Sequence, residues 1–321
     1  MIGTDVGYAE QLLKEGRLVA IPTETVYGLA GNALNTGVVA SIFEVKNRPS
    51  FDPLIVHFSS LQAARPYIAA LPEPARQLAH LYTPGPLTLL LKKSNRIPDM
   101  VTAGSPWVAI RIPAHPLTHQ LLANLPFPLA APSANPFGYI SPTTARHVEA
   151  QLGQKLPYIL DGGPCEVGLE STIVGFPEGQ VVVYRKGGIA VEDIEAAVGP
   201  IEVRPHSVSN PKAPGMLKSH YAPSVPLKIG GLPEALSAFP THQIGLIRFK
   251  TPHPGIPANQ QIVLSPSGEI REAAQRRFAG MRQLDRQELA VIVAELLPET
   301  GLGRAINDRL RRAAAQDASS A

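Results

Sequence analysis

Apolar runs of strand length alternate with amphipathic stretches of helix length through the first two hundred residues. The short apolar runs predict strands at residues 18–21, 54–58, 87–91, 108–112, 128–131, 158–160, 171–176 and 181–184. Apolar positions three and four apart predict helices at residues 8–14, 36–45, 61–70, 73–82, 116–124 and 143–152. Because strands that alternate with helices are typical of α/β proteins, we expect an α/β fold.

The pattern changes at residues 199–226, which contain six prolines and no clear periodicity. A second alternation follows, with strands predicted at 227–229, 244–249, 262–264 and 290–293 and helices at 269–283 and 303–315. These two patterns predict a domain large enough for a catalytic site at 1–199, a proline-rich linker at 200–226 and a small Rossmann-like domain at 227–321.

Composition narrows the class of protein. Hydrophobic residues make up 44% of the 321-residue chain and charged residues 17%, as in an ordinary globular protein. No apolar run approaches the roughly 20 residues of a membrane span, and the N-terminus does not resemble a secretory signal, so we expect no membrane association and a cytoplasmic location. The single cysteine, Cys165, excludes an internal disulfide framework and a cysteine-based zinc site.

The net charge of +3 is unevenly distributed. Residues 1–200 contain 14 Lys and Arg against 16 Asp and Glu, whereas residues 201–321 contain 15 against 10. The second half is therefore basic, which would suit an anionic macromolecule, although a solvated basic helix face explains it as well.

One stretch has more polar side chains than a core needs. An apolar run at 18–21 leads into Pro22-Thr-Glu-Thr-Val-Tyr-Gly-Leu-Ala-Gly31, whose two glycines allow close backbone approach. Lys46 and Arg48 follow at the predicted end of a helix, beside Pro49. The helix dipole alone favours two cations there, but Lys-x-Arg next to a hydroxyl-rich loop would also make an anion clamp.

Other candidates are scattered along the first domain. Arg111 lies in an apolar run and must be paired if buried, with a protein carboxylate or with a ligand anion. Ser133 and Asn135 lie between prolines after a predicted strand, where a plain turn is equally compatible. The glycine-rich segment 161–172 lacks the ending of a Walker A loop, and Cys165 has no basic neighbour that would activate it. These residue types suit phosphates and small zwitterions, and none is an obvious covalent nucleophile.

The motifs occur in a recognisable order. Pro-Thr-Glu-Thr-Val-Tyr-Gly-Leu, Lys-x-Arg-Pro, Pro-Leu-Ile-Val-His, Val-Ala-Ile-Arg-Ile-Pro, Pro-Ser-Ala-Asn and Gly-Leu-Glu-Ser-Thr-Ile-Val resemble the threonylcarbamoyl-AMP synthase family, with its YrdC-type domain, over residues 5–200. Pro-Gly-Met-Leu-Lys-Ser-His-Tyr-Ala-Pro and the late Gly-Leu-Gly-Arg-Ala-Ile-Asn-Asp-Arg-Leu resemble the extra domain of the family's long form. The resemblance implies a YrdC-like twisted mixed sheet with flanking helices, plus the small Rossmann-like domain.

The resemblance also implies an activity. L-threonine, bicarbonate and ATP would give L-threonylcarbamoyl-AMP and pyrophosphate, for modification of tRNA next to the anticodon by a downstream threonylcarbamoyl-transferase complex. It implies a threonine site that uses Thr25, His57, Arg111, the backbone at Ala131, and Ser171. It implies an ATP site that uses Arg48, Asp52, the backbone near Trp107, Ser133, Asn135, Ser141, Arg185 and Tyr221, with Lys46 and Arg48 as catalytic cations and Mg²⁺ accompanying ATP.

Two further expectations depend on these assignments. The proline-rich linker that contains Tyr221 is the candidate for a cover over the labile product. Trp107 departs from the small or hydroxylated residue expected at its position. The competing interpretation is a non-catalytic protein that binds double-stranded RNA or tRNA, supported by the basic second half. A carbamoyl transferase of the hydrogenase-maturation type would need zinc-finger and acylphosphatase segments, which the sequence lacks.

Overall fold

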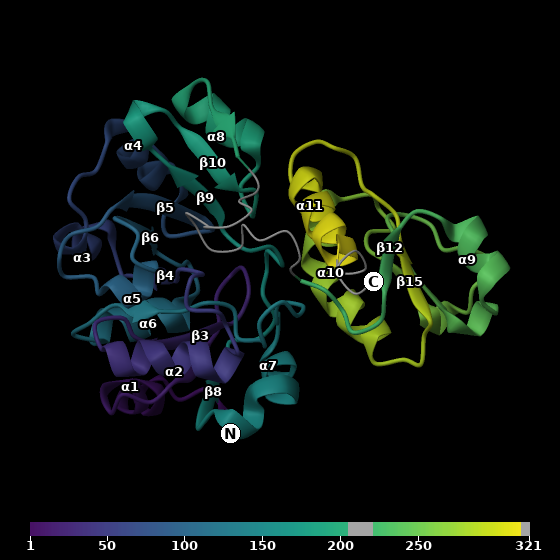
Figure 1. Ribbon diagram of the computed structural model, residues 1–321, viewed down its shortest axis with the longest axis horizontal. Helices are drawn as coiled ribbons and strands as arrows, with labels where there is room; N and C mark the ends of the chain where they lie inside the picture. Colours follow the sequence, from purple (N-terminus) through teal and green to yellow (C-terminus); the bar gives the residue numbers. More distant parts are fainter. Residues whose placement is uncertain (205–220, 316–321) are drawn as a thin grey trace.

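The computed structural model describes residues 1–204 and 221–315. Figure 1 shows two α/β bodies side by side: a large one built from the first part of the chain and a smaller one built from the last. In the described residues, no helix is long and apolar enough to cross a lipid bilayer.

A mixed eleven-stranded sheet forms the large body, in the order β1-β8-β2-β3-β7-β4-β6-β5-β9-β10-β11. Its strands are β1 (Ile2–Gly3), β2 (Val19–Ile21), β3 (Gly28–Asn32), β4 (Ile55–His57), β5 (Leu87–Lys92), β6 (Trp107–Arg111), β7 (Leu129–Ala130), β8 (Tyr158–Leu160), β9 (Thr172–Gly175), β10 (Val182–Arg185) and β11 (Glu202–Val203). Strands β4 and β6 are parallel, and their register places His57 opposite Arg111. Two predicted site residues are therefore neighbours at one end of the sheet.

The helices of the large body are mostly short. They are α1 (Val6–Lys14), α2 (Thr36–Lys46), α3 (Leu61–Ala64), α4 (Glu73–Tyr82), α5 (Asp99–Thr102), α6 (Pro116–Asn124), α7 (Ala145–Leu152) and α8 (Val191–Val198). Helix α2 begins at Asn35, whose side chain accepts hydrogen bonds from the amides of Gly37 and Val38. It ends at Asn47, which adopts the left-handed conformation with φ 51°. Lys46 and Arg48 thus flank a fixed helix end.

The smaller body is a parallel four-stranded sheet covered by helices, as the pattern predicted. Its strands β12 (Leu227–Ile229), β13 (Ile244–Arg248), β14 (Gln261–Val263) and β15 (Val291–Ala294) lie in the order β12-β15-β13-β14. Its helices are α9 (Leu232–Ala238), α10 (Ile270–Asp285) and α11 (Gly303–Ala314). Helices α10 and α11 face the large body (Figure 1).

One apolar cluster includes residues of both bodies. Val26, Ile140 and Leu169 of the large body belong to the same buried cluster as Phe278 and Leu310 of the smaller one. Burial of a shared cluster stabilises the arrangement of the two bodies. Segments near the candidate site, at residues 26, 140 and 169, therefore pack against the C-terminal domain.

Some elements differ from the expected ones. Strand β3 begins inside the segment 23–31 that we interpreted as a loop, and the predicted helix at 61–70 stops at Ala64 before a 3-10 turn at Arg65–Tyr67. Pro66 within that turn has no amide hydrogen for the next helical bond. All but the last three residues of the segment 214–223 lie outside the described residues.

Candidate functional site

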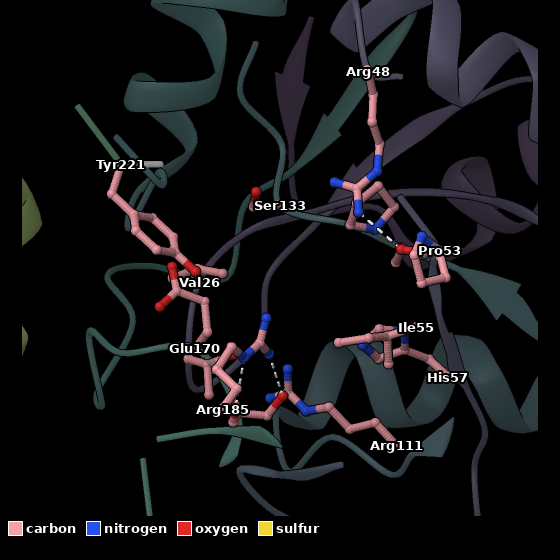
Figure 2. Close-up of a pocket in the computed structure, with 14 residues that line it drawn as sticks. Val26, Arg48, Pro53, Ile55, His57, Arg111, Ser133, Glu170, Arg185 and Tyr221 are labelled. Atoms are coloured by element: carbon pink, nitrogen blue, oxygen red, sulfur yellow. Dashed lines mark hydrogen bonds between the residues drawn. The ribbon is translucent and has the colours of Figure 1, made fainter. Parts of the chain in front are cut away.

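A pocket opens at the ends of the central strands of the large sheet (Figure 2). Polar side chains converge on it from β4, β6 and β10, from the residues just before β9, from the 23–27 loop and the 131–133 turn, and from Arg48 and Tyr221. The residues that line it are Thr25, Val26, Arg48, Pro53, Ile55, His57, Arg111, Ala131, Pro132, Ser133, Glu170, Ser171, Arg185 and Tyr221. Nine of the predicted site residues are thus brought together from eight separate sequence segments.

The 23–27 loop is held by its own hydroxyls. The Thr23 hydroxyl donates to the carbonyl of Val26 at 2.6 Å and is hydrogen-bonded to the Thr25 hydroxyl at 2.8 Å. Tyr27 anchors the end of the loop, since its hydroxyl donates to the carbonyl of Gly163 at 2.8 Å. The loop therefore presents Thr25 to the pocket in one fixed arrangement.

Arg111 has a protein partner as well as a position in the pocket. Its Nη2 lies 2.6 Å from Oε1 of Glu24, and both side chains are almost fully buried. The other carboxylate oxygen of Glu24 accepts the amide of Ala114 at 3.1 Å. Of the two partners that the sequence left open for Arg111, the protein carboxylate is present, and the guanidinium still lines the pocket.

His57 lies beside Arg111 and is neutral near pH 7. Burial of the ring, and then the nearby charge of Arg111, lower its pKa to about 3. Its Nδ1 atom is buried without a hydrogen-bond partner in the described part of the chain. A neutral imidazole with an available ring nitrogen can contact a ligand without adding charge.

Arg48 lies on the opposite side of the pocket and Lys46 lies behind that wall, and both side chains are buried. The Lys46 ammonium donates to the carbonyl of Ser133 at 2.5 Å and also to that of Asn135. Arg48 donates to the carbonyl of Pro53 at 2.8 Å, and its Nη2 lies 2.9 Å from a carboxylate oxygen of Asp52, without hydrogen-bond alignment. Burial lowers the pKa of both cations. Lys46 therefore fixes the 133–135 turn from behind, and Arg48 faces the pocket.

Arg185 and Ser171 close the remaining side. Arg185 donates to the backbone carbonyl of Ser171 at 3.0 Å and to its hydroxyl at 2.9 Å. The same hydroxyl is hydrogen-bonded to Thr88 at 2.7 Å. Burial lowers the pKa of Arg185 to about 10, so the guanidinium stays charged at neutral pH. Tyr221 lines the pocket next to Glu170 (Figure 2) and is 1% exposed.

Five predicted residues are not in the pocket wall. They are Lys46, Asp52, Trp107, Asn135 and Ser141. Four of them lie directly behind the wall. Lys46 donates to the carbonyls of Ser133 and Asn135, and Asp52 pairs with Arg48. The Ser141 hydroxyl donates to Glu170 at 2.8 Å. The Trp107 side chain lines a separate surface cleft with Leu90, Phe176 and Tyr184.

Two acidic residues, Glu24 and Glu170, belong to the site although neither was among the predicted site residues. Burial alone would raise the pKa of Glu170, but the charges of Arg309, Arg185 and Arg277 outweigh it and lower the pKa to about 2. Each acid stands beside a hydroxyl residue in a quoted motif, Thr-Glu-Thr and Glu-Ser-Thr. A charged residue inside such a motif is the sequence signal that could have identified both acids as site residues.

The site combines buried cations with hydroxyls and a neutral imidazole. Arg48, Arg111 and Arg185 converge on one small space, and buried cations of this density favour an anionic ligand. Cys165 is buried, and burial raises the pKa of its thiol to about 12, so it is no activated nucleophile. The described residues also contain no group of three His, Cys, Asp or Glu side chains that could hold a metal ion. The fold and site define an α/β protein with a small pocket lined by buried cations, which suits an anionic ligand.

Comparison with known proteins places the chain in a family. Residues 11–187 match the Sua5/YciO/YrdC family, described as telomere recombination, and residues 189–315 match the C-terminal domain of threonylcarbamoyl-AMP synthase. The chain belongs to the threonylcarbamoyl-AMP synthase family, in its two-domain form, and is a nucleotidyltransferase-type enzyme.

Individual relatives agree with this assignment. The threonylcarbamoyl-AMP synthase of Pyrococcus abyssi is 39% identical over 320 residues, which cover 95% of this chain and 92% of the relative. That of Bacillus subtilis is also 39% identical, over 96% of this chain and 92% of the relative. The crystal structure of P. abyssi Sua5 complexed with L-threonine superposes with a TM-score of 0.90 at 38% identity, covering 97% of this chain and 94% of that one. The predicted family and fold class are confirmed, and the non-catalytic alternative is wrong.

Proposed function

We propose that the protein makes L-threonylcarbamoyl-AMP from L-threonine, bicarbonate and ATP, with release of pyrophosphate. The observation that supports this most is the convergence of Arg48, Arg111 and Arg185 on one pocket that also contains Thr25 and Ser171. Cations on two sides of a pocket suit two anionic reactants, an amino-acid carboxylate and a triphosphate. The threonine bound to the P. abyssi relative agrees with this assignment.

Threonine would occupy the side formed by Arg111 and His57. Arg111 suits the carboxylate, because a guanidinium binds two oxygens at once. The amide of Ala131 already donates to Ile55 at 3.1 Å, so a contact at Ala131 would use its carbonyl to accept the amino group. Thr25 and Ser171 would contact the remaining polar atoms of the amino acid.

ATP would occupy the side formed by Arg48 and Arg185. These two guanidiniums would neutralise phosphate charge, and Ser133 would contact the phosphates from the turn that Lys46 fixes. Asp52 orients Arg48 through their 2.9 Å ion pair. The remaining predicted nucleotide contacts, at Asn135, Ser141, Tyr221 and the backbone of Trp107, stay predictions.

The reaction needs no nucleophile from the protein. The threonine amine attacks carbon dioxide derived from bicarbonate and loses a proton, which gives a carbamate. A carbamate oxygen attacks the α-phosphorus of ATP, and the bond to the bridging oxygen breaks with pyrophosphate as leaving group. The protein aligns the two reactants and stabilises the charge on the phosphates, which is consistent with the buried, unactivated thiol of Cys165.

Magnesium would arrive with ATP. Mg²⁺ in ATP sites is usually held by phosphate oxygens with one or two carboxylates. Since no three-ligand group occurs in residues 1–204 and 221–315, the site fits a metal bound to substrate phosphates better than a resident ion. Bound there, the ion would neutralise the charge of the pyrophosphate leaving group.

The product would be consumed by a transferase that moves the threonylcarbamoyl group to the adenosine next to the tRNA anticodon. A mixed anhydride with AMP is an activated donor, which suits transfer of its acyl group to a nucleoside amine. Whether tRNA also contacts this chain is a separate proposal, supported only by the basic second half.

The test is pyrophosphate release with each substrate omitted in turn. We expect release only when ATP, threonine and bicarbonate are all present. L-valine, which has the shape of threonine without its hydroxyl, should substitute poorly if Thr25 and Ser171 recognise that hydroxyl. Release that is independent of threonine would contradict the proposal.

A further inference from the structure

Tyr221 enters the pocket wall from a backbone that needs support from its surroundings. Its φ is 71°, in the left-handed region that a bulky side chain rarely occupies. Such a conformation is unfavourable and persists only where the surrounding structure fixes it. The side chain is buried and lines the pocket (Figure 2). The contacts of the residues next to Tyr221 therefore matter for where its ring lies.

The residue after Tyr221 is bound to a loop of the catalytic domain. Ala222 forms a parallel bridge with Tyr139, and its amide donates to the carbonyl of Gly138 at 2.9 Å. The carbonyl of Tyr139 accepts from the side chain of Asn135 at 2.9 Å. The loop that holds Ala222 is thus tied to the turn at the edge of the pocket.

A carboxylate of the C-terminal domain joins both sides of this bridge. Asp285 is the last residue of α10, and its Oδ1 accepts the amide of Val225 at 2.9 Å. Its other oxygen, Oδ2, accepts the hydroxyl of Tyr139. The helix dipole opposes an acidic side chain at the C-terminal end of a helix, so Asp285 does not stabilise α10 by its charge. What its carboxylate does is to connect two segments outside the helix.

Arg282 holds the same loop from one helical turn earlier. Its guanidinium carbon lies 5.1 Å from the centre of the Tyr139 ring, and its Nη2 donates to the carbonyl of Ile140. The ring of Tyr139 is thus held at its face by Arg282 and at its hydroxyl by Asp285. Asp285 extends this contact to the segment that follows Tyr221.

We propose that Asp285 is a positioning residue that fixes the backbone of residues 221–225 and so keeps the Tyr221 ring in the wall of the nucleotide site. The ring also lies 5.9 Å from the ring of Phe278 and 4.9 Å from the guanidinium carbon of Arg309. Those two contacts orient the ring, whereas Asp285 fixes the chain that bears it. The inference rests on the proposed function, because it assigns Tyr221 to ATP.

The test compares Asp285→Ala with Asp285→Asn. Asp285 is only partly buried at a helix end and alanine favours helices, so α10 should remain folded. We expect Asp285→Ala to raise KM for ATP about tenfold, equivalent to about 1.4 kcal/mol, and KM for threonine less than twofold. Asparagine retains an acceptor for the Val225 amide and can donate to the Tyr139 hydroxyl, which also accepts. It should therefore restore KM for ATP to within twofold of the unmodified value.

Two further variants separate positioning from a general effect. In a Tyr221→Ala background there is no ring to position, so adding Asp285→Ala should change KM for ATP less than twofold. Glu288→Ala is the matched control, because Glu288 is exposed and lies three residues beyond Asp285. It removes the same charge near the same helix end and should leave both KM values unchanged.

Amide hydrogen exchange tests the positioning without turnover. The amides of Ala222 and Val225 donate to Gly138 and Asp285, so both should be protected from exchange in the unmodified protein. In Asp285→Ala we expect both to exchange at least tenfold faster. The amides of the central strand β6 should keep their rates, because the change is local.

The outcomes separate this inference from the proposed function. A KM for ATP that rises less than threefold in Asp285→Ala, or unchanged exchange at Ala222 and Val225, overturns the inference. Equal losses for ATP and threonine, an undiminished effect in the Tyr221→Ala background, or faster exchange throughout the protein would indicate a purely structural role and overturn it as well. If the unmodified enzyme releases no pyrophosphate with threonine, the proposed function fails instead, and the exchange comparison still decides whether Asp285 fixes residues 221–225.

Discussion

Arg111 offers a way to separate the structural and the substrate roles of one residue. Replacing Arg111 by Met leaves Glu24 buried without its 2.6 Å partner, and breaking a buried ion pair in this way costs about 3–5 kcal/mol of folding free energy. The Arg111→Met/Glu24→Gln double variant removes both charges, so most of that stability should return. If Arg111 also binds the threonine carboxylate, the double variant should still lose about 1.5–3 kcal/mol of threonine binding, roughly 10- to 150-fold in KM.

Two measurements test this prediction. Urea unfolding of the single and double variants reports the free energy of unfolding, and the threonine dependence of pyrophosphate release reports substrate binding. KM for ATP serves as the internal control and should change little. A double variant that regains stability and has the wild-type threonine KM would refute the assignment of Arg111 to the substrate carboxylate.

Three further predictions use other buried groups. Lys46→Met should lower the rate of pyrophosphate release at least 100-fold, which corresponds to about 2.7 kcal/mol, because the turn at Ser133 and Asn135 loses its charged donor. Near-normal turnover in a folded variant would contradict this. The folded-state pKa of His57 is about 3 against an ordinary 6.5, so the unfolded chain binds a proton that the folded chain does not, and stability should fall as pH drops from about 6.5 towards 3. Urea unfolding of His57→Asn should show a flatter pH dependence over that range, and an unchanged slope would exclude His57 as the cause. Cys165, whose thiol pKa burial raises to about 12, should react with a thiol reagent only after unfolding, and rapid modification of the native protein would contradict its burial.

Much of the fold follows from the sequence because local signals and packing agree. Helix α4 (Glu73–Tyr82) and helix α6 (Pro116–Asn124) have the predicted bounds, each with a proline within its first two positions. Order along the sheet does not follow from such signals: β3 pairs with β7, nearly a hundred residues later. The pairing depends on long-range contacts that no local pattern encodes.

The glycines of the opening stretch illustrate the same limit. They indicated close approach of the backbone to another group, and at Gly31 that group is the protein itself. A Cβ there would lie 2.6 Å from Val38 and 2.8 Å from Leu18. The position therefore allows helix α2 to pack on the sheet.

The residues that line the candidate site were predicted better than the ion pairs that hold them. Residue types and the family resemblance identified Thr25, Arg111 and Arg185, which all line one pocket. The resemblance did not identify Glu170 as a group held between Ser141 and Arg309, because that contact joins residues 139 positions apart. Buried acids beside buried cations can be located only once the tertiary structure is known.

The central claim is tested most directly by the identity of the product. The enzyme is incubated with ATP, Mg²⁺, L-threonine and ¹³C-labelled bicarbonate, and the nucleotide product is analysed by mass spectrometry at once, because the product is labile in water. The account predicts a single adenylate that contains threonine and one labelled carbon. A threonyl adenylate without the labelled carbon, or AMP formation that does not depend on threonine, would contradict it.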